Sequence, residues 1–483
     1  MLRPVTLPFP EYRPDIAPVN SSFSDTANNV IPAAMSYRPL SSATAYSGAM
    51  GSRCQGAVAI VDNGGNALNF AGDATKLYKL TSAAWSDVTG TALTTPADVN
   101  IGFAKFGNLI IAVNGSNAPQ SYDITSSSAF ADLAGSPPAA RYIAVVRDFV
   151  VLGNLPSSPN SIQWSGFNNA TQWTAGANQS DAQEFPDGGW VQGVVGGDVM
   201  YVFQEKSIRR GTYVGGDLIF QFDEIAQNRG LAAPGSLAKV GDRTYFLDYD
   251  GFYVLAGDQV LPIGKERIDK TFFANVNQSY LYRVQAAIDP INSLVIWGYP
   301  STASADGTLD SLLIYNWAID RFSTGALTSE YIYGALGEGY TLEQLDAFGT
   351  LETLPFSLDS RVWTGGSVSL GVFGSDHKLS YLTGANLEAT LSTSEAALLN
   401  GRRAFVNDTR PVVDSDAATV AVGVRERFAD AAAYTDESAM ETSGNCPVRA
   451  SGRYGKARLT IPAGASWSHA SAIDLFVRDA GTR

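Results

Sequence analysis

One local pattern recurs along most of the chain. A short apolar strand runs into a tight turn, and a second apolar strand leaves it. The expected turns lie near Gly64, Gly107, Asp148, Gly197, Asp242 and Ile291, with a weaker one near Gly339. Successive turns are 41 to 49 residues apart, and further strand-like sequence follows each pair. Apolar runs bounded by Gly, Asn and Asp are typical of antiparallel hairpins, so the spacing predicts a unit of about four strands in roughly 45 residues.

A unit of that size matches one blade of a β-propeller. It cannot bury both faces of its sheet alone, so neighbouring units are expected to stack face to face around an axis. Seven units predict an all-β fold with a β-propeller of about seven blades over 46–375, and six or eight blades are the alternatives. The 47 glycines and 22 prolines, spread over 483 residues, suit a chain of many short strands and turns.

The two ends of the chain lack this repeat. Five prolines in the first eighteen residues predict an extended N-terminal arm over 1–45. The arm is either a disordered tail or a strap over its own domain or a neighbour. Its aromatic residues favour the strap, because a solvated tail would not need them: Phe9, Tyr12, Phe23 and Tyr37. Residues 376–483 contain strictly alternating runs such as "TVAVGVRERF" and "KARLTIPAG", which predict half-buried antiparallel strands in a C-terminal β-sandwich-like domain. A short helix is expected within 264–276.

Four tryptophans are candidate packing residues. The segment "SIQWSGFNNATQW" (161–173) predicts a strand that carries Trp164, a polar turn, and a partner strand that carries Trp173. We expect both indoles to pack between blades, and we expect the same of Trp190 and Trp297. The alternative is that these tryptophans are stacking platforms for a sugar or a nucleic-acid base.

Residues for catalysis or metal binding are scarce. Two histidines and two cysteines lie far apart, so a zinc site and a His-based triad lack ligands, and the isolated thiols suit a reducing cytoplasm. Five aspartates at predicted turns have a local role as acceptors of backbone N–H groups, although paired carboxylates in a propeller hydrolase are the alternative. These residues are Asp187, Asp198, Asp248, Asp250 and Asp289. We therefore expect no enzymatic activity, no cofactor and no metal site.

The charge balance argues against stable nucleic-acid binding. The formal net charge is −14, the opposite of what phosphate neutralisation needs, although an acidic wall would let DNA pass without sticking. One basic cluster, Lys206, Arg209 and Arg210, lies in "QEKSIRRGTY". It is either a charged strand edge that resists pairing with other strands or a contact to DNA or to a neighbouring subunit. The sequence contains no apolar run long enough to span a membrane.

Three parts of the chain, 12–40, 160–320 and 445–480, carry short recognisable motifs. They include Asn-Val-x-Pro and Tyr-x-Pro within "NNVIPAAMSYRPL", Trp-Ser-Gly within "SIQWSGFNNATQW", the run "VGDRTYFLDYDGFYVLAGDQVLPIG", and "GRYGKARLTIPAGASWSHASAIDL". Together these stretches resemble the tail nozzle or hub proteins of short-tailed bacteriophages. The matching residues are turn and packing residues, so no site residue carries over from the family.

The resemblance implies a structural virion protein. Such a protein would form a homo-oligomeric, sixfold ring below the portal and adaptor, retain the packaged DNA, and form its exit channel. Its expected partners are the portal–adaptor complex, tail fibre, spike or needle proteins, and genomic DNA in transient contact. It would be made in the host cytoplasm and end in the virion tail. A carbohydrate-binding tail adhesin built on a propeller is the alternative.

Overall fold

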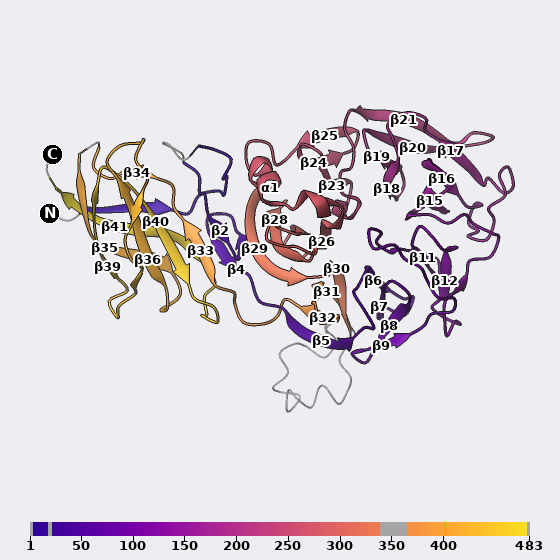
Figure 1. Cartoon of the computed structure of the whole chain (residues 1–483), viewed down its shortest axis with the longest axis horizontal. Helices are drawn as coiled ribbons and strands as arrows, with labels where there is room; N and C mark the ends of the chain where they lie inside the picture. Colours follow the sequence, from indigo (N-terminus) through magenta and orange to yellow (C-terminus); the bar gives the residue numbers. More distant parts are fainter. Residues whose placement is uncertain (1–2, 18–21, 339–364, 401, 481–483) are drawn as a thin grey trace.

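The computed structural model describes residues 3–17, 22–338, 365–400 and 402–480. Within these ranges the regular structure is almost all β-strand, with one α-helix, α1 (Asp269–Asn275), inside the segment expected to be helical. The strands form a larger and a smaller lobe, which lie side by side in Figure 1. No helix in the described ranges is long and apolar enough to cross a membrane.

The larger lobe is built from small antiparallel sheets in a propeller-like arrangement (Figure 1). The first three are β6 (Gly56–Val61), β7 (Ala67–Gly72), β8 (Leu77–Thr81) and β9 (Ala84–Asp87); β10 (Gly102–Phe106), β11 (Leu109–Val113), β12 (Gln120–Asp123) and β13 (Ala131–Asp132); and β14 (Tyr142–Val146), β15 (Phe149–Leu155), β16 (Ser158–Trp164) and β17 (Asp181–Glu184).

Two more sheets of the same kind follow along the chain. They are β18 (Val191–Val195), β19 (Met200–Gln204), β20 (Ser207–Gly215) and β21 (Ile219–Gln227), then β22 (Ala238–Val240), β23 (Arg243–Asp248), β24 (Gly251–Ala256) and β25 (Gln259–Pro262). After helix α1 come β26 (Gln285–Asp289), β27 (Leu294–Tyr299), β28 (Leu309–Asn316) and β29 (Arg321–Ser329), which pair in that order within a larger sheet.

The last small sheet combines strands from both ends of the larger lobe. Its members are β30 (Tyr331–Glu338), β31 (Gly365–Phe373), β32 (Lys378–Tyr381) and, as the fourth strand, β5 (Thr44–Ala49). β5 precedes every other strand of this lobe in the sequence and pairs antiparallel with β32. The first and last sheets also touch, because β30 contacts β6. The larger lobe therefore closes on itself.

The six predicted turns up to Ile291 each fall between the first two strands of a sheet, as between β10 and β11 or between β22 and β23. The predicted turn near Gly339 lies outside the described residues. First strands of successive sheets contact one another, β6 with β10, β10 with β14, and β14 with β18. Apolar side chains of facing sheets fill the space between them, because each small sheet is too narrow to bury its own faces.

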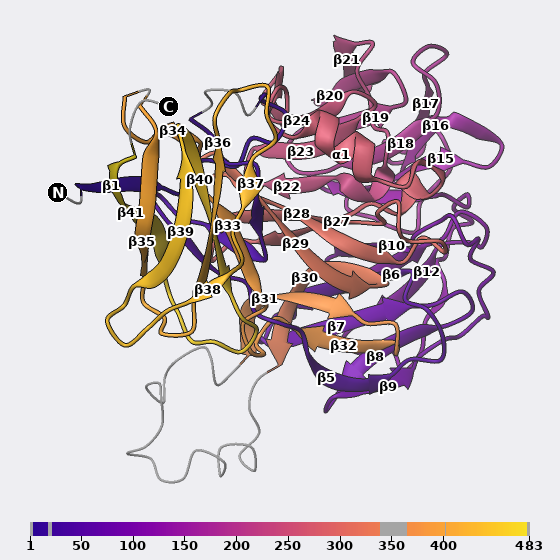
Figure 2. The same cartoon turned by 60° about the vertical axis from the view of Figure 1, so that its left-hand side comes forward.

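The smaller lobe contains two sheets that share one apolar core (Figure 2). One sheet has the order β3 (Val30–Pro32), β4 (Tyr37–Pro39), β41 (Ala470–Asp479), β35 (Ala404–Val413) and β39 (Cys446–Gly452), with β1 (Arg3–Pro8) also paired to β41. The other runs through β2 (Ala27–Asn28), β33 (Ala389–Ser392), β40 (Tyr454–Ile461), β36 (Thr419–Arg425) and β37 (Ala433–Tyr434), with β34 (Ala396–Ala397) beside β40 and β38 (Ser438–Ala439) beside β36. β40 alternates buried and partly exposed residues along its whole length, as its sequence pattern requires.

Candidate functional site

The N-terminal segment is the structural link between the lobes. We call residues 3–49, where described, the arm. Its strands β1, β3 and β4 belong to the smaller lobe, and β5 belongs to the larger one. Between them, β2 pairs antiparallel with β33 and parallel with β29, so one continuous sheet runs from the larger lobe into the smaller one. The arm is therefore a strap over its own chain and not a disordered tail.

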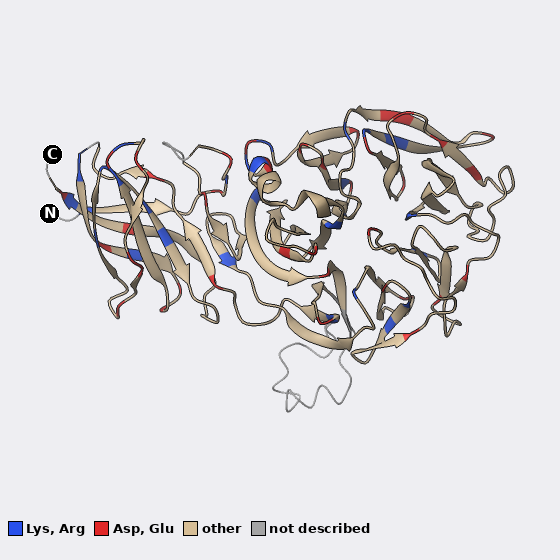
Figure 3. Cartoon of the chain, viewed as in Figure 1, with Lys and Arg blue, Asp and Glu red and all other residues tan. Residues whose placement is uncertain are grey.

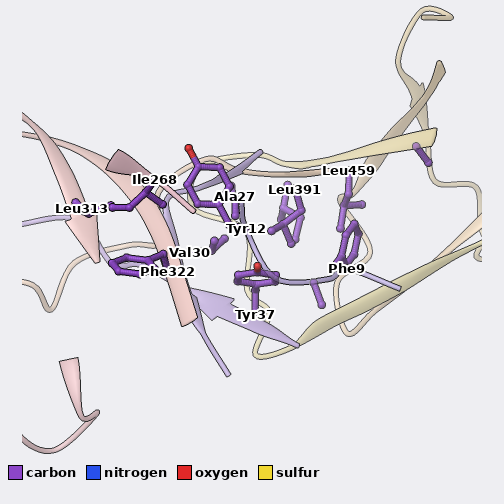
Figure 4. Packing of buried hydrophobic residues seen from close by; sticks show 14 of the residues in the cluster. Phe9, Tyr12, Ala27, Val30, Tyr37, Ile268, Leu313, Phe322, Leu391 and Leu459 are labelled. Atoms are coloured by element: carbon purple, nitrogen blue, oxygen red, sulfur yellow. The ribbon is translucent and has the colours of Figure 1, made fainter. Parts of the chain in front are cut away.

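The apolar side chains of the arm join the two cores. Figure 4 shows the arm residues between side chains of the smaller lobe and side chains of the larger lobe. All belong to one buried cluster, which includes Phe9, Tyr12, Val30, Tyr37, Ile268, Leu313, Phe322, Leu391 and Leu459. Phe9 is 2% exposed and Tyr37 is fully buried. Because one core crosses the boundary, separation of the lobes would expose apolar surface on both.

Charged residues of the arm bind helix α1 and the segment before it. Glu11 forms an ion pair with Arg267, whose guanidinium also contacts Asp320 at 2.8 Å. Asp15 accepts hydrogen bonds from the backbone N–H groups of Lys270 and Thr271, both at 2.8 Å. These N–H groups at the start of a helix have no partner within it, so Asp15 caps α1 from a distant part of the chain.

A second set of polar contacts holds the arm against the rest of the interface. Arg321 donates to the carbonyl oxygens of Ala33 (2.8 Å) and Pro10 (2.9 Å), and its guanidinium stacks 4.8 Å from the ring centre of Tyr37. Tyr37 in turn donates its O–H to Pro10 at 2.8 Å. Side chains of β29 and β4 thus donate hydrogen bonds to carbonyl groups of the arm, which has little regular structure.

Asp25 extends these contacts to the smaller lobe. Its carboxylate lies 2.8 Å from the Lys456 ammonium and accepts a 2.6 Å hydrogen bond from Ser392. Burial alone would raise the pKa of Asp25, but the hydrogen bonds from Lys456 and Ser392 outweigh burial and lower it. The ionised carboxylate is therefore the form that the fold stabilises.

Three of the four predicted tryptophans are buried between neighbouring sheets. Trp164 is 2% exposed and lies 5.2 Å, ring centre to ring centre, from Phe220 of the next sheet. Trp173 is 4% exposed, in a cluster shared by the second and third sheets. Trp297 is fully buried, 4.7 Å from the ring of Phe252. Trp173 lies in the loop before β17, so the expectation that it sits on a partner strand was wrong.

Trp190 does not pack in this way. Its side chain is 52% exposed, in the loop just before β18. Its backbone N–H and C=O are bonded to Glu205, but its indole faces solvent. The expectation that it packs between sheets is therefore corrected. Its position before the first strand of a sheet places it at the surface, where neighbouring sheets no longer cover it.

Nearby carboxylates neutralise the two arginines of the predicted basic cluster. Arg209 lies 2.6 Å from Asp187, and Arg210 lies 2.5 Å from Asp258 and 3.1 Å from Asp223. Figure 3 shows a basic segment on β20 and an acidic segment on β21, the strand that pairs with it. Lys206 is exposed in the turn before β20. The two arginines are engaged in ion pairs, which leaves little positive charge for a phosphate.

Four of the five aspartates considered for hydrolysis have local structural partners, and the fifth, Asp198, is exposed. Asp248 is buried and Asp250 is exposed, and Arg229 contacts both, at 3.2 and 2.5 Å. Asp187 pairs with Arg209, and Asp289 accepts backbone N–H groups in its own turn. No group of three or more His, Cys, Asp or Glu side chains that could hold a metal ion occurs among the described residues. Cys54 and Cys446 are separate, buried thiols.

The residues that join the lobes were not found from the sequence, apart from the aromatic anchors Phe9, Tyr12 and Tyr37. Glu11, Asp15, Arg267 and Arg321 are ordinary charged residues with partners more than 250 positions away in the sequence. The sequence contained only a weak signal for the contact between the arm and α1, because an acidic residue in the arm precedes no helix that it could cap. A short helix predicted at 264–276 and an arm with three acidic and three basic residues give no reason to pair Asp15 with that helix.

Comparisons with known proteins give no family. No family model matches the chain, and no curated protein matches it. Among solved structures, the chain is similar to the computationally designed Ika8 protein, with 11% sequence identity and a TM-score of 0.36. That similarity covers 71% of this chain and 99% of the designed one.

Proposed function

We propose that this chain is a structural subunit of a phage virion, a tail nozzle or hub that assembles as a homo-oligomeric ring below the portal and adaptor. The main support is the arm, which joins a propeller-like lobe and a second β-lobe into one rigid unit with a shared core. Such a unit suits a load-bearing ring, because repeated interfaces around an axis require subunits of fixed shape.

We further propose that the larger lobe is a seven-bladed propeller. The six separate four-stranded sheets and the β26–β29 part of the larger sheet supply the blades. Pairing of β5 with β32 would then close the ring, since the last blade takes one strand from the start of the lobe. A closed ring leaves only short outer edges for unwanted strand pairing.

The charge of the molecule fits contact with DNA that must remain mobile. The net charge is −14, and the two arginines of the basic cluster, Arg209 and Arg210, are paired with carboxylates. An acidic lining would repel the phosphate backbone, so DNA would be retained by a physical barrier and would leave without sticking.

Copy number in purified particles tests this proposal. Quantitative mass spectrometry of the phage that encodes the chain should give about one copy for every two copies of the portal, as expected for a sixfold ring under a twelvefold portal. Absence of the chain from particles that contain the portal would overturn the proposal. The purified chain alone should also form ring-shaped oligomers in electron micrographs.

Trp190 favours a second candidate, a carbohydrate-binding tail adhesin. Its exposed indole offers the flat apolar face on which a sugar ring stacks. If this function is correct, host polysaccharide should change the tryptophan fluorescence of the chain, and Trp190→Ala should abolish that change. A fluorescence change that persists in Trp190→Ala, or no change with any glycan of a broad panel, would reject this candidate.

A further inference from the structure

A cavity of about 250 Å³ lies where the arm meets α1 and the strands β27, β28 and β29. We call it the junction cavity. Its polar lining residues are Tyr12, Asn28, Thr271, Asn275, Tyr299, Ser311 and Thr324, and its apolar ones include Ile268, Phe272 and Leu313. The arm supplies Tyr12 and Asn28, so the docked arm completes a cavity that no single segment of sequence encodes.

The hydroxyl of Tyr12 is a buried polar group without a partner in the protein. The residue is 7% exposed, and its hydroxyl forms no hydrogen bond with any of the described residues. Figure 4 shows this hydroxyl on the side of Ile268, another lining residue, and away from the ring of Tyr37. Burial raises the pKa of Tyr12, so the hydroxyl keeps its proton for donation. A buried hydroxyl without a partner is unfavourable, which indicates that an occupant of the cavity bonds to it.

Two side-chain amides add donors and acceptors to the lining. Asn28 accepts a 3.3 Å hydrogen bond from the Thr324 hydroxyl, but its own N–H groups donate to none of the described residues. Asn275 donates to the Tyr299 hydroxyl at 3.2 Å. These bonds fix the acceptor side of Asn28 and the position of Asn275, and the cavity gains polar groups from the arm, from α1 and from β27.

Among the described residues, no charged side chain lines the cavity. The lining residue Thr271 donates its hydroxyl to Asp15 at 2.7 Å, so a carboxylate already lies behind that wall. A charged ligand would lose its water without gaining a counter-charge, and an anion would also be repelled by Asp15. A wholly apolar ligand would leave Tyr12 and Asn28 unpaired. The class that remains is small, neutral and rich in hydroxyl groups.

The apolar part of the lining and the size of the cavity suit the same class. The rings of Phe272 and Tyr299 lie 4.9 Å apart, centre to centre, at an angle of 64°. Together with Ile268 and Leu313 they give apolar walls against which the C–H groups of a polyol can pack. A cavity of about 250 Å³ is slightly smaller than the roughly 300–1,000 Å³ of sites for drug-sized ligands, so it limits the ligand to one small ring or a short open chain.

We propose that the junction cavity binds one small neutral polyhydroxyl molecule through hydrogen bonds to Tyr12, Asn28 and Asn275. A monosaccharide and an open-chain polyol share this chemistry. Because the ligand contacts both the arm and α1, its binding also holds the arm against the larger lobe. The proposal does not depend on assembly into a virion. It also does not depend on Trp190, which lies in the loop before β18 and does not line this cavity.

Calorimetric titration of the full chain tests the proposal and separates the two sources. The neutral probes are glucose, galactose, mannose, glycerol and sorbitol, and the charged counterparts are glucuronate and glycerate at constant ionic strength. At least one neutral probe should bind saturably. Binding of ring sugars alone assigns a monosaccharide, and binding of glycerol or sorbitol alone assigns an open-chain polyol. Absence of saturable binding by every neutral probe would mean that only water fills the cavity and would overturn the proposal. Binding of a charged counterpart as tight as that of its neutral relative would overturn it as well.

Tyr12→Phe removes the unpartnered hydroxyl and nothing else. It should weaken binding about threefold to tenfold, because one hydrogen bond to the ligand is lost. The unliganded variant should unfold at the same temperature as the wild type or higher, since the hydroxyl has no partner in the protein. Tyr249→Phe is the matched control: it removes the hydroxyl of a residue that is 56% exposed in the turn between β23 and β24, and should leave affinity unchanged. Wild-type affinity in Tyr12→Phe, or equal weakening in both variants, would place the ligand elsewhere and reject the site.

Ala326→Trp obstructs the cavity at its mouth. Ala326 is an exposed residue of the lining, so a large side chain there should abolish binding. Ala182→Trp, at an exposed position of β17, is the control for the added indole and should bind as the wild type does. The bound probe should also slow exchange of backbone amide hydrogens in 11–16 and in 269–275, which line the cavity from two sides. Retained affinity in Ala326→Trp, or slower exchange only in other segments, would overturn the proposal.

Discussion

At the scale of single residues, the three tryptophans buried between sheets of the larger lobe, Trp164, Trp173 and Trp297, each have a hydrogen-bonded indole N–H. The indole N–H of Trp297 donates to the carbonyl oxygen of Ser236 at 3.0 Å, and that of Trp173 donates to Ala170 at 2.7 Å. A buried indole contributes a large apolar area, and its N–H costs free energy if it has no partner. Each side chain thus supplies packing between sheets and one hydrogen bond.

Truncation of a buried indole should therefore be far more costly than truncation of the exposed one. Trp297→Ala is expected to lower the free energy of unfolding by about 3–5 kcal/mol, because it leaves a cavity beside Phe252. Trp190→Ala should change it by less than about 0.5 kcal/mol, as for other exposed positions. Urea denaturation followed by circular dichroism measures both. Similar losses in the two variants would contradict the assignment of Trp190 to the surface.

Asp269 is a buried carboxyl group that the fold prefers to keep protonated. It is 8% exposed, and burial raises its pKa to about 7. One backbone N–H, that of Phe252, donates to it at 3.1 Å. The negative charges of Asp15 and Asp250 raise the pKa further. In the unfolded chain the same carboxyl group titrates near pH 4, so folding and protonation of Asp269 are linked.

Between about pH 4 and pH 7 the unfolded chain loses this proton while the folded chain retains it. The contribution of Asp269 to stability therefore falls as the pH rises through that range and levels off above it. Asp269→Asn keeps the acceptor oxygen without the charge. The variant should equal the wild type near pH 4 and exceed it at pH 8 by up to roughly 4 kcal/mol. Denaturation curves at both pH values test this, and a difference that does not vary with pH would contradict it.

At the scale of elements, the arm depends on side-chain anchors more than on its strands. β2 has only two residues, and β3 and β4 have three each. Strands so short carry no readable alternation, which is why the sequence predicted an extended arm but not its pairing. β40 alternates strictly over its eight residues, β41 alternates from Ile473 to Val477, and strands were expected in this part of the chain. Strands with long alternating runs were therefore predicted from the sequence, and strands of two or three residues were not.

Removal of the Asp15 cap should loosen the contact between the arm and α1. Asp15→Ala leaves the N–H groups of Lys270 and Thr271 without their acceptor and should cost about 1 kcal/mol. Exchange of backbone amide hydrogens should accelerate in 269–275 and in 11–16. The amides of the four-stranded sheets in the larger lobe should remain protected. Asp217→Ala, in an exposed turn, is the matched control. Unchanged exchange of α1 in Asp15→Ala would mean that this cap is dispensable.

At the scale of the whole molecule, the repeat predicted the small sheets, but the way they close could not be predicted from it. A regular spacing of hairpins predicts one sheet after another. It does not indicate which strand completes the last sheet. β5 fulfils that role from a segment assigned to the boundary of the arm, with its partner more than 300 positions further along the chain.

A covalent link across this closure should stabilise the larger lobe. Ala45 and Ser380 are paired residues of β5 and β32, so the double variant A45C/S380C places two thiols at a spacing typical of neighbouring strands. Oxidation should raise the free energy of unfolding by up to about 5 kcal/mol, since a very long loop is closed. The reduced double variant and A45C alone are the controls. No difference between oxidised and reduced forms would indicate that β5 does not limit opening of the lobe.

The pairing of β1 with β41 also determines when the chain can finish folding during its synthesis. Arg3 lies opposite Val477, so β1 must wait for a partner strand that is made more than 470 residues later. At ordinary ribosomal speeds the delay is roughly 25–90 s. A chain that stops early lacks β41 and leaves β1, β4 and β35 without their shared partner. Prematurely terminated products would thus expose strand edges that proteases and chaperones recognise, and only chains that contain β41 could complete the smaller lobe.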